Sequence, residues 1–387
     1  MLERFEIPYR PDVMINFGSN SVMTMGNAET VTENFLKKFK FIFSFQLYVT
    51  EFEEAVADII LPDTCYLERF TPAVSWPSTF SHPQGEDDWG WTFRQPVVEP
   101  LFERRDFNVV ILDMMKKLGL AKEYYKGMNE TVPMRYGGEL EEKNALKTDG
   151  SQDYSWEDIC DSLLRDRFGD EHNIEWFKKN GVLTWPKLKE DVYWKWFSPV
   201  RVPVYFEYFI DGGEKITNII KEFGGEKHIP LDWSRFKPLA DWYPCPTHTE
   251  KNPEYDMYTF YWRAIMHCNS LTQQNPWLDE LSQEDPYVYA LQMHKKTAAE
   301  KGIGEGDKVW LENPEGHRVK GWVALTEGIE PHHLAVAAVA CHWTPYQPIA
   351  KDKGTFFNDL VEMDKAHTDP LTLNQDICCR VKIYRAE

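Results

Sequence analysis

The sequence lacks any run of about 18 apolar residues, the length that a membrane-spanning helix needs. Its most apolar stretches, residues 41–45 and 334–340, have only the length of β-strands. Positive charge is scarce as well, because 43 Lys and Arg residues stand against 62 Asp and Glu residues and give a formal net charge of −19. Nucleic acids bind to clustered Lys and Arg, so this balance argues against a nucleic-acid partner. We expect a soluble chain with no membrane span, in the cytoplasm or the periplasm.

The seven cysteines are odd in number and show no C-x-x-C spacing. This pattern indicates neither a disulfide framework nor a zinc ribbon, and reduced thiols are expected. His332, His333, Cys341 and His342 are of the residue types that bind zinc or copper. Adjacent residues of a strand point to opposite faces, so His332 and His333 cannot easily share an ion. We therefore predict no protein-ligated metal site.

Motifs of common catalytic and nucleotide sites are also missing. There is no G-x-G-x-x-G or G-x-x-x-x-G-K loop, no G-x-S-x-G nucleophile elbow, and no spacing that selects one pair of carboxylates. The Gly-rich segment 301–307 is followed by a strand pattern rather than a helix, so it predicts a turn into a β-hairpin. The catalytic residues are therefore unknown at this level.

The first part of the chain shows the alternation of a β-α-β unit, and 387 residues are enough for two or three domains. Apolar strand patterns at 13–17, 41–45 and 57–62 enclose a helix at 28–38, which Asn27 can cap. Near-continuous apolar strands that alternate with amphipathic helices are typical of a parallel sheet covered on both faces.

Three small or polar residues, Gly18, Ser19 and Asn20, follow the first strand, at the edge where open parallel sheets bind ligands. Small residues there let backbone N–H groups approach a phosphate. We expect the Asn20 side chain to face the ligand crevice rather than the core. A purely structural turn is the alternative explanation.

The middle of the chain, 76–255, is rich in Trp, Tyr and Pro and has a less regular pattern. Helices are predicted at 106–118, with Asp106 as the N-cap, and near 156–168. Segment 122–152 is polar, Gly-rich and charged, which we interpret as a surface excursion rather than core. We interpret the whole region as a mixed connecting or substrate-side part.

From residue 256 onward the pattern changes to short strands and tight turns. Strand patterns at 308–312 and 318–323 flank a turn at 314–316, which predicts a hairpin. A further strand near 379–384 would close what we interpret as a β-barrel.

Several motifs occur in a characteristic order along the chain. The first part contains Gly18-Ser19-Asn20 after a strand, Gln46-x-x-x-Thr50-Glu51, and Ala57-Asp58-Ile59-Ile60-Leu61-Pro62. The last part contains His267-Cys268-Asn269-Ser270, Asn275-Pro276-Trp277-Leu278, Gly306-Asp307-Lys308-Val309, His342-Trp343 and Asn358. This order resembles the C-terminal half of one family, the molybdopterin oxidoreductases of the dimethyl sulfoxide reductase family. The first set is similar to the family's second nucleotide-binding domain, and the second set resembles its molybdopterin-dinucleotide-binding barrel.

The resemblance implies an α/β fold in three parts. Residues 1–75 would belong to a parallel, Rossmann-like dinucleotide-binding domain, and residues 76–255 would form the mixed region. Residues 256–387 would form a molybdopterin-dinucleotide-binding double-psi β-barrel.

The resemblance also implies a cofactor, molybdopterin guanine dinucleotide with molybdenum or tungsten. Its pyrophosphate, nucleoside and pterin need many hydrogen bonds. Gly18, Ser19 and Asn20 are expected at the pyrophosphate or ribose, and Gln46, Thr50 and Asp58 at the nucleoside end. The barrel residues expected to bind the cofactor are His267, Asn269, Ser270, Gln273, His342, Trp343, Asn358 and Gln375.

The family's N-terminal half has no counterpart here, and it holds the metal-ligating residue and, where present, the iron–sulfur cysteines. We therefore expect the cofactor-binding part of a bis-pterin-dinucleotide oxidoreductase, inactive alone, that serves redox or oxygen-atom or hydroxyl transfer, as in anaerobic respiration. Expected partners are the missing half or a separate catalytic chain, and an iron–sulfur electron-transfer subunit. The alternatives are a non-catalytic binding or assembly module and a member of the hydratase, transhydroxylase or dehydroxylase branch.

Overall fold

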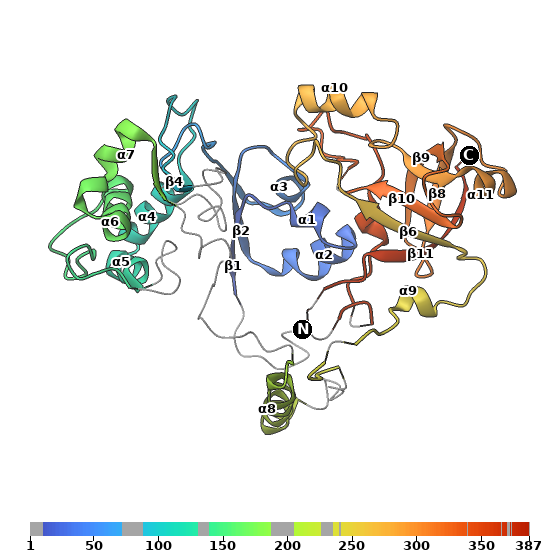
Figure 1. Ribbon diagram of the computed structural model, residues 1–387, viewed down its shortest axis with the longest axis horizontal. Coiled ribbons are helices and arrows are strands. Elements are labelled where there is room, and N and C mark those ends of the chain that lie inside the picture. The colour runs from blue at the N-terminus through green and yellow to red at the C-terminus, as the bar shows by residue number, and fades with distance from the viewer. Residues whose placement is uncertain are drawn as a thin grey trace. The chain divides into compact units, whose positions relative to one another are not determined.

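The computed structural model describes residues 11–71, 88–130, 139–186, 205–225, 235–239, 241–338, 340–364, 366–369, 372 and 374–386 (Figure 1). The chain divides into two compact units. The first unit comprises Met1–Ser44, Tyr48–Ile60 and Val202–Glu387, and the second comprises Phe45–Leu47 and Leu61–Arg201.

A three-stranded parallel sheet with the order β1-β2-β3 begins the chain, as the sequence predicts. Its elements are β1 (Val13–Phe17), α1 (Ser21–Thr24), α2 (Ala28–Asn34), η1 (Leu36–Lys38), β2 (Phe41–Gln46), α3 (Glu51–Val56) and β3 (Ile59–Pro62). Asn27 caps α2 by accepting a hydrogen bond from the Thr30 backbone N–H at 3.0 Å. The helix ends at Asn34, earlier than the predicted residue 38, because Phe35 leaves the helical region and a 3-10 turn follows.

The predicted cover on both faces is found at the central strand β2, whose residues 42–46 are all buried, but not along β1 and β3. Val31, Leu36 and Phe52 pack in one cluster with Ile42 of β2. On β1, the side chains of Val13, Ile15 and Phe17 alternate with more buried ones and are 47% to 53% exposed. The helix residues of this cluster therefore cover one face of the sheet, and alternate side chains of β1 are exposed among the described residues.

The C-terminal part forms a closed six-stranded barrel with the strand order β10-β6-β11-β8-β9-β7. Strand β10 pairs with β6 and β7 pairs with β9 in parallel, and the remaining neighbours are antiparallel. Both the predicted hairpin and the predicted closing strand are confirmed. The strands are β6 (Met257–Trp262), β7 (Leu291–His294), β8 (Lys308–Glu312), β9 (Arg318–Thr326), β10 (His333–Ala337) and β11 (Cys378–Arg385).

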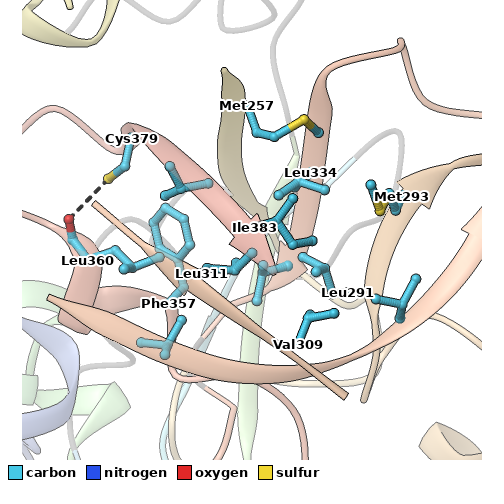
Figure 2. Packing of buried hydrophobic residues seen from close by; sticks show 14 of the residues in the cluster. Met257, Leu291, Met293, Val309, Leu311, Leu334, Phe357, Leu360, Cys379 and Ile383 are labelled. Atoms are coloured by element: carbon cyan, nitrogen blue, oxygen red, sulfur yellow. Dashed lines mark hydrogen bonds between the residues drawn. The ribbon is translucent and has the colours of Figure 1, made fainter. Parts of the chain in front are cut away.

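Alternate residues of the barrel strands fill its interior (Figure 2). Val309 and Leu311 of β8 face Val381 and Ile383 of β11 in one buried cluster. Each such side chain stabilises the fold by about 1.5–3 kcal/mol when it is fully buried. The short helix η6 (Phe357–Leu360) contributes Phe357 and Leu360 to the same core, which fixes this helix against the barrel.

The first unit also contains α-helices in the part of the chain that supplies the barrel strands. Helix α10 (Pro276–Glu284) begins after Asn275, whose side chain accepts from the backbone N–H groups of Trp277 and Leu278. The other described α-helices after residue 202 are α8 (Tyr208–Glu222), α9 (Pro246–Thr249) and α11 (Lys295–Glu300).

The second unit packs helices against a two-stranded antiparallel sheet of β4 (Asp88–Thr92) and β5 (Val182–Pro186). Its helices are α4 (Phe107–Lys117), α5 (Ala121–Glu130), α6 (Trp156–Phe168), η3 (Asp170–His172) and α7 (Ile174–Asn180). The prediction for 106–118, including its Asp106 cap, is confirmed to within a residue, and α6 spans the predicted 156–168.

The interpretation of 122–152 as a surface excursion is wrong. Most of α5 lies in this segment, and Tyr125, Leu140 and Leu146 are buried in the core of the second unit. The few apolar residues are spaced widely among charged ones, so average polarity concealed a helix that buries only one narrow face.

Candidate functional site

A cavity of about 800 Å³ lies between the barrel and the turn that joins α1 to α2. Thr24, the last residue of α1, and Gly26 of that turn form one wall, and the segment after β6 forms much of the opposite wall. Its described lining residues are Thr24, Gly26, Tyr261, Arg263, Ala264, His267, Cys268, Asn269, Ala338, Asn358, Val361, Asn374, Gln375 and Ile377.

Arg263 is the one permanently charged side chain among the described residues of this lining. It is exposed and forms no hydrogen bond or ion pair with any other residue that the structure describes. The protein around it carries a formal net charge of −19, so an unpaired guanidinium in a cavity favours an anionic ligand.

His267 lines the cavity with a ring that its own neighbours already satisfy. Its Nε2 lies 2.8 Å from the Ser282 hydroxyl, which itself donates to the Leu278 carbonyl at 2.7 Å. Ser282 must therefore accept from His267, which places the ring proton on Nε2. Nδ1, 3.1 Å from the Thr272 hydroxyl, then accepts a hydrogen bond. Burial lowers the pKa of His267, only partly offset by the charge of Asp279, and favours this neutral ring.

Gly26 and Asn27 hold the α1–α2 turn close to the barrel. A Cβ on residue 26 would lie 2.5 Å from the Val361 carbonyl oxygen, so only glycine fits this contact. Asn27 donates its backbone N–H to the Asn358 carbonyl at 2.9 Å, and Asn358 donates its side-chain amide to the Met23 carbonyl at 2.9 Å. The two cavity walls are thus joined by direct hydrogen bonds.

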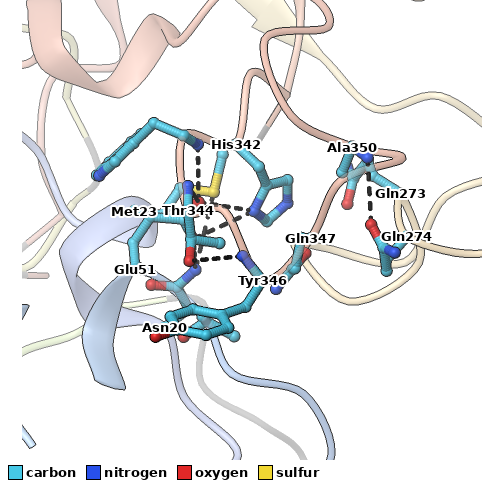
Figure 3. Close-up of polar contacts among 12 residues, drawn as sticks. Asn20, Met23, Glu51, Gln273, Gln274, His342, Thr344, Tyr346, Gln347 and Ala350 are labelled. Carbon is cyan, nitrogen blue, oxygen red and sulfur yellow. Dashed lines mark hydrogen bonds and ion pairs between the residues drawn. The ribbon is translucent and has the colours of Figure 1, made fainter. Parts of the chain in front are cut away.

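A buried carboxylate, Glu51 at the start of α3, forms a second polar centre in the first unit (Figure 3). Both of its oxygens lie 3.1 Å from His342 Nδ1, and neither side chain is exposed. The backbone N–H groups of Trp343 and Thr344 donate to Oε1 at 2.9 and 3.2 Å, and Asn20 donates to Oε2 at 2.8 Å.

These donors determine the charge state of Glu51. Burial alone would raise the pKa of the carboxyl group, but the hydrogen bond and the charge of His342, together with the other donors, lower it to about 2. Glu51 is therefore ionised at neutral pH. Since an ionised carboxylate only accepts hydrogen bonds, His342 Nδ1 carries a proton and Asn20 presents its amide nitrogen to Glu51.

The structure places the predicted site residues in several places. His267, Asn269, Asn358 and Gln375 line the cavity, whereas Ser270 and Gln273 are buried in the turn beside it. Asn20, His342 and Trp343 meet at Glu51, and Thr50 caps α3 next to them. Gly18 and Ser19 are exposed after β1; Gln46 is buried at the end of β2, and Asp58 is exposed and accepts from the Ile42 backbone N–H.

Sequence reasoning missed Arg263, Thr24 and Gly26 of the cavity, and it gave Glu51 no role. Arg263 sits four residues before His267 with no motif of its own in the residue pattern, and Glu51 meets His342 across 291 positions of sequence. The scarcity of positive charge was the one signal that could have drawn attention to Arg263.

The described residues contain no group of three or more His, Cys, Asp or Glu side chains arranged to hold a metal ion. Nor does any described helix combine the length and apolarity needed to cross a membrane.

Comparison with known proteins assigns the region that forms most of the cavity. The family described as "Molydopterin dinucleotide binding domain" matches residues 257–375. The thiosulfate reductase molybdopterin-containing subunit PhsA of Salmonella typhimurium is 28% identical over 302 residues, which are 76% of this chain and 33% of that protein. A sulfite dehydrogenase subunit from Allochromatium vinosum is 23% identical over 375 residues, 86% of this chain and 37% of that protein.

Among solved structures, acetylene hydratase from Pelobacter acetylenicus is similar in fold, with a TM-score of 0.60 and 16% identity. That alignment covers 100% of this chain and 46% of the hydratase. The chain spans about a third of the length of the curated relatives it matches.

The barrel region is thus a domain of the class that binds the dinucleotide form of molybdopterin. The resemblance of the motifs to the molybdopterin oxidoreductases of the dimethyl sulfoxide reductase family is confirmed by this domain match and by the similarity to a molybdopterin-containing reductase subunit.

Proposed function

We propose that the cavity beside the α1–α2 turn binds the dinucleotide part of a molybdopterin cofactor. The observation that carries this proposal is the lining: neutral amides, backbone and one unpaired guanidinium, Arg263, in an acidic protein. A pyrophosphate is anionic and rich in acceptors, so it pairs well with a guanidinium and with amide N–H groups. This donor set fits the group that the family's barrel domain binds.

The polar residues of the lining offer a ligand different kinds of hydrogen-bond donor. Arg263 would pair with a phosphate, and Asn269, Asn374 and Gln375 offer amides to phosphate, ribose or base. His267 contributes a wall rather than a free hydrogen bond, because both of its ring nitrogens are occupied within the chain.

The remaining site residues predicted from the sequence stay proposals. Gly18 and Ser19, and Asn20 through its backbone, would serve the pyrophosphate or ribose, and Gln46, Thr50 and Asp58 the nucleoside end. Ser270, Gln273, His342 and Trp343 complete the proposed set. The guanine form of the cofactor, its bis-pterin arrangement and the Rossmann-like, mixed and double-psi parts at 1–75, 76–255 and 256–387 belong to the same proposal.

The function that follows is that of the cofactor-holding part of a molybdenum or tungsten oxidoreductase. When bound, the metal would supply redox or oxygen-atom transfer chemistry, and this chain would bind and orient the pterin dinucleotide. Since the chain spans about a third of its relatives, we propose that another polypeptide segment or chain supplies the metal ligand and any iron–sulfur cluster. The chain alone would then turn over no substrate.

Calorimetric titration with guanosine 5′-diphosphate tests the binding site, because this probe carries the proposed guanosine and pyrophosphate. Loss of one charge-assisted hydrogen bond costs about 1.5–3 kcal/mol, so Arg263→Ala should weaken binding at least tenfold. Arg318→Ala is the matched control, because Arg318 lies on β9 against the Trp310 ring and outside the cavity lining. Equal affinity of Arg263→Ala and the unmodified chain would contradict the proposed site. No binding to either would favour a module without this function.

A further inference from the structure

Glu51 is the main hydrogen-bond partner of two buried side chains, Asn20 and His342. Asn20 Oδ1 and His342 Nε2 are buried and have no hydrogen-bond partner among the described residues. The Asn20 amide nitrogen donates to Glu51 at 2.8 Å, with one weaker contact of 3.8 Å to Met23 Sδ. Within the described part of the chain, the His342 ring forms hydrogen bonds with Glu51 alone. The orientation of both side chains therefore depends on this carboxylate.

Asn20 connects Glu51 to one wall of the cavity through a single helical turn. The backbone N–H and the hydroxyl of Thr24 both donate to the Asn20 carbonyl at 2.9 Å. Thr24 and Gly26, two residues further, form that wall. A shift of Asn20 would thus move Thr24 and the cavity wall, because two hydrogen bonds tie Thr24 to the Asn20 carbonyl.

His342 connects Glu51 to the opposite wall. It follows β10 by five residues, and Ala338, directly after β10, lines the cavity. The Ala338 backbone N–H donates to the Trp262 carbonyl of β6 at 2.8 Å, which fixes it to the barrel. The backbone N–H groups of Trp343 and Thr344 also donate to Glu51, so the carboxylate holds residues 342–344 together.

We propose that Glu51 is a positioning residue for the cavity, holding the α1–α2 turn and the loop after β10 at the separation that the ligand requires. This inference rests on the proposed dinucleotide site and names a residue that touches no ligand itself. Burying a carboxylate to join two segments has a large desolvation cost, and well-packed apolar residues often stabilise a fold as much or more. What a carboxylate adds is direction: its lone pairs select one orientation for each of its donors.

The test uses the full chain with Glu51→Gln, which keeps the size of the side chain and removes its charge. Residues 20–27 should exchange their amide hydrogens at least tenfold faster, while exchange in β8 and β9 stays unchanged. Affinity for guanosine 5′-diphosphate should fall at least tenfold. Should this variant fail to fold, Asn20→Ser cuts only the link to the α1 wall and is expected to show both effects.

Glu68→Gln is the matched control for a general loss of stability. Glu68 is also buried, accepts from the backbone N–H groups of Cys65 and Leu101, and pairs with Arg104 at 3.1 Å, but it belongs to the second unit. Its replacement should lower the melting temperature and leave the affinity of the cavity unchanged.

A compensating exchange separates positioning from a merely structural role. In Asn20→Asp combined with Glu51→Gln, the new amide can donate to the new carboxylate, which restores the link to α1. Exchange at 20–27 and affinity should both recover in part. Unchanged exchange at 20–27 in Glu51→Gln, or loss of affinity in Glu68→Gln to the same extent, would overturn the inference. If the unmodified chain binds no probe, the proposed function fails, while the exchange data still decide the positioning role.

Discussion

Gly26 approaches Val361 so closely that a Cβ on residue 26 would lie 2.5 Å from the Val361 carbonyl oxygen and 3.0 Å from its Cγ1. The first distance is shorter than any normal contact of a Cβ atom, and the Val361 carbonyl oxygen belongs to the backbone, so it cannot move away as a flexible side chain could. Both residues line the cavity, so the contact is part of the wall of the candidate site.

Gly26→Ala should therefore destabilise the first unit by about 1–3 kcal/mol, the usual cost of overpacking. Urea unfolding followed by tryptophan fluorescence measures this change. Gly127→Ala is the control, because Gly127 lies within α5 and a Cβ there meets nothing within 4 Å. Alanine in a helix interior should stabilise by about 0.5–1 kcal/mol. A Gly26→Ala protein as stable as the unmodified one would show that the turn and the barrel can separate.

The ionisation of Glu51 predicts a pH dependence with a definite sign. The pKa is lowered to about 2 in the fold, from an ordinary value of 4.5, so the folded state favours the carboxylate. This contribution is fully present above about pH 4.5 and is lost as the pH falls toward 2. A shift of this size corresponds to stability on the order of 3 kcal/mol.

The free energy of unfolding should accordingly fall more steeply in the unmodified chain than in Glu51→Gln between pH 5 and 3. The comparison is made between the two proteins because other carboxyl groups, Glu68 and Asp279 among them, also have lowered pKa values. Parallel pH profiles for the two proteins would mean that Glu51 is not held in its ionised form by the fold.

His267 offers a prediction about its ring proton. Ser282 accepts from Nε2, so Ser282→Ala should leave that N–H without a partner and destabilise by about 1 kcal/mol. Nitrogen-15 NMR of the ring should show a proton on Nε2 in the unmodified chain, and its Nδ1 signal should stay that of an acceptor. Thr249→Ala is a control on an exposed hydroxyl, where a change within about 0.5 kcal/mol is expected. A proton found on Nδ1 instead would reverse the assignment of donor and acceptor.

The sequence predicted the elements whose signals are local. The hairpin at 308–323 has its turn residues between two strand patterns, and α6 has its own cap in Ser155, so both could be located without tertiary knowledge. Segment 122–152 shows the opposite case: Tyr125 is buried only because residues from other helices meet it, and no local pattern contains that information.

The candidate site divides in the same way. His267, Asn269, Asn358 and Gln375 were predicted through family motifs and do line one cavity. The hydrogen-bonding role of His267 could not be predicted, because its two ring nitrogens form hydrogen bonds with Thr272 and Ser282 of the same chain. The Glu51–His342 pair could not be predicted, because the spacing of residues in a single sequence does not indicate a contact between residues 291 positions apart.

Asn20 and Ser19 are neighbours in the turn after β1, yet the structure gives them opposite surroundings. Ser19 is exposed, whereas Asn20 is 3% exposed and donates to Glu51, so the expectation that the Asn20 side chain faces the ligand crevice is wrong. Asn20→Leu should destabilise by about 1–3 kcal/mol, because it removes a donor from a buried carboxylate. Ser19→Leu should change stability by less than about 0.5 kcal/mol.

Ligand affinity also distinguishes Ser19→Leu from Asn20→Leu, because the Ser19 variant should lose affinity without losing stability. If the exposed end of this turn meets the pyrophosphate or ribose, Ser19→Leu should weaken affinity for guanosine 5′-diphosphate while the protein stays fully folded. Asn20→Leu should weaken affinity only together with faster amide exchange at residues 20–27. Thermal melts, amide hydrogen exchange and calorimetry should therefore show lost affinity alone in Ser19→Leu, and lost affinity with lower stability and faster exchange in Asn20→Leu. A stable Asn20→Leu protein with unchanged exchange would show that Glu51 keeps its place without Asn20, and an unaltered affinity of Ser19→Leu would remove Ser19 from the proposed site.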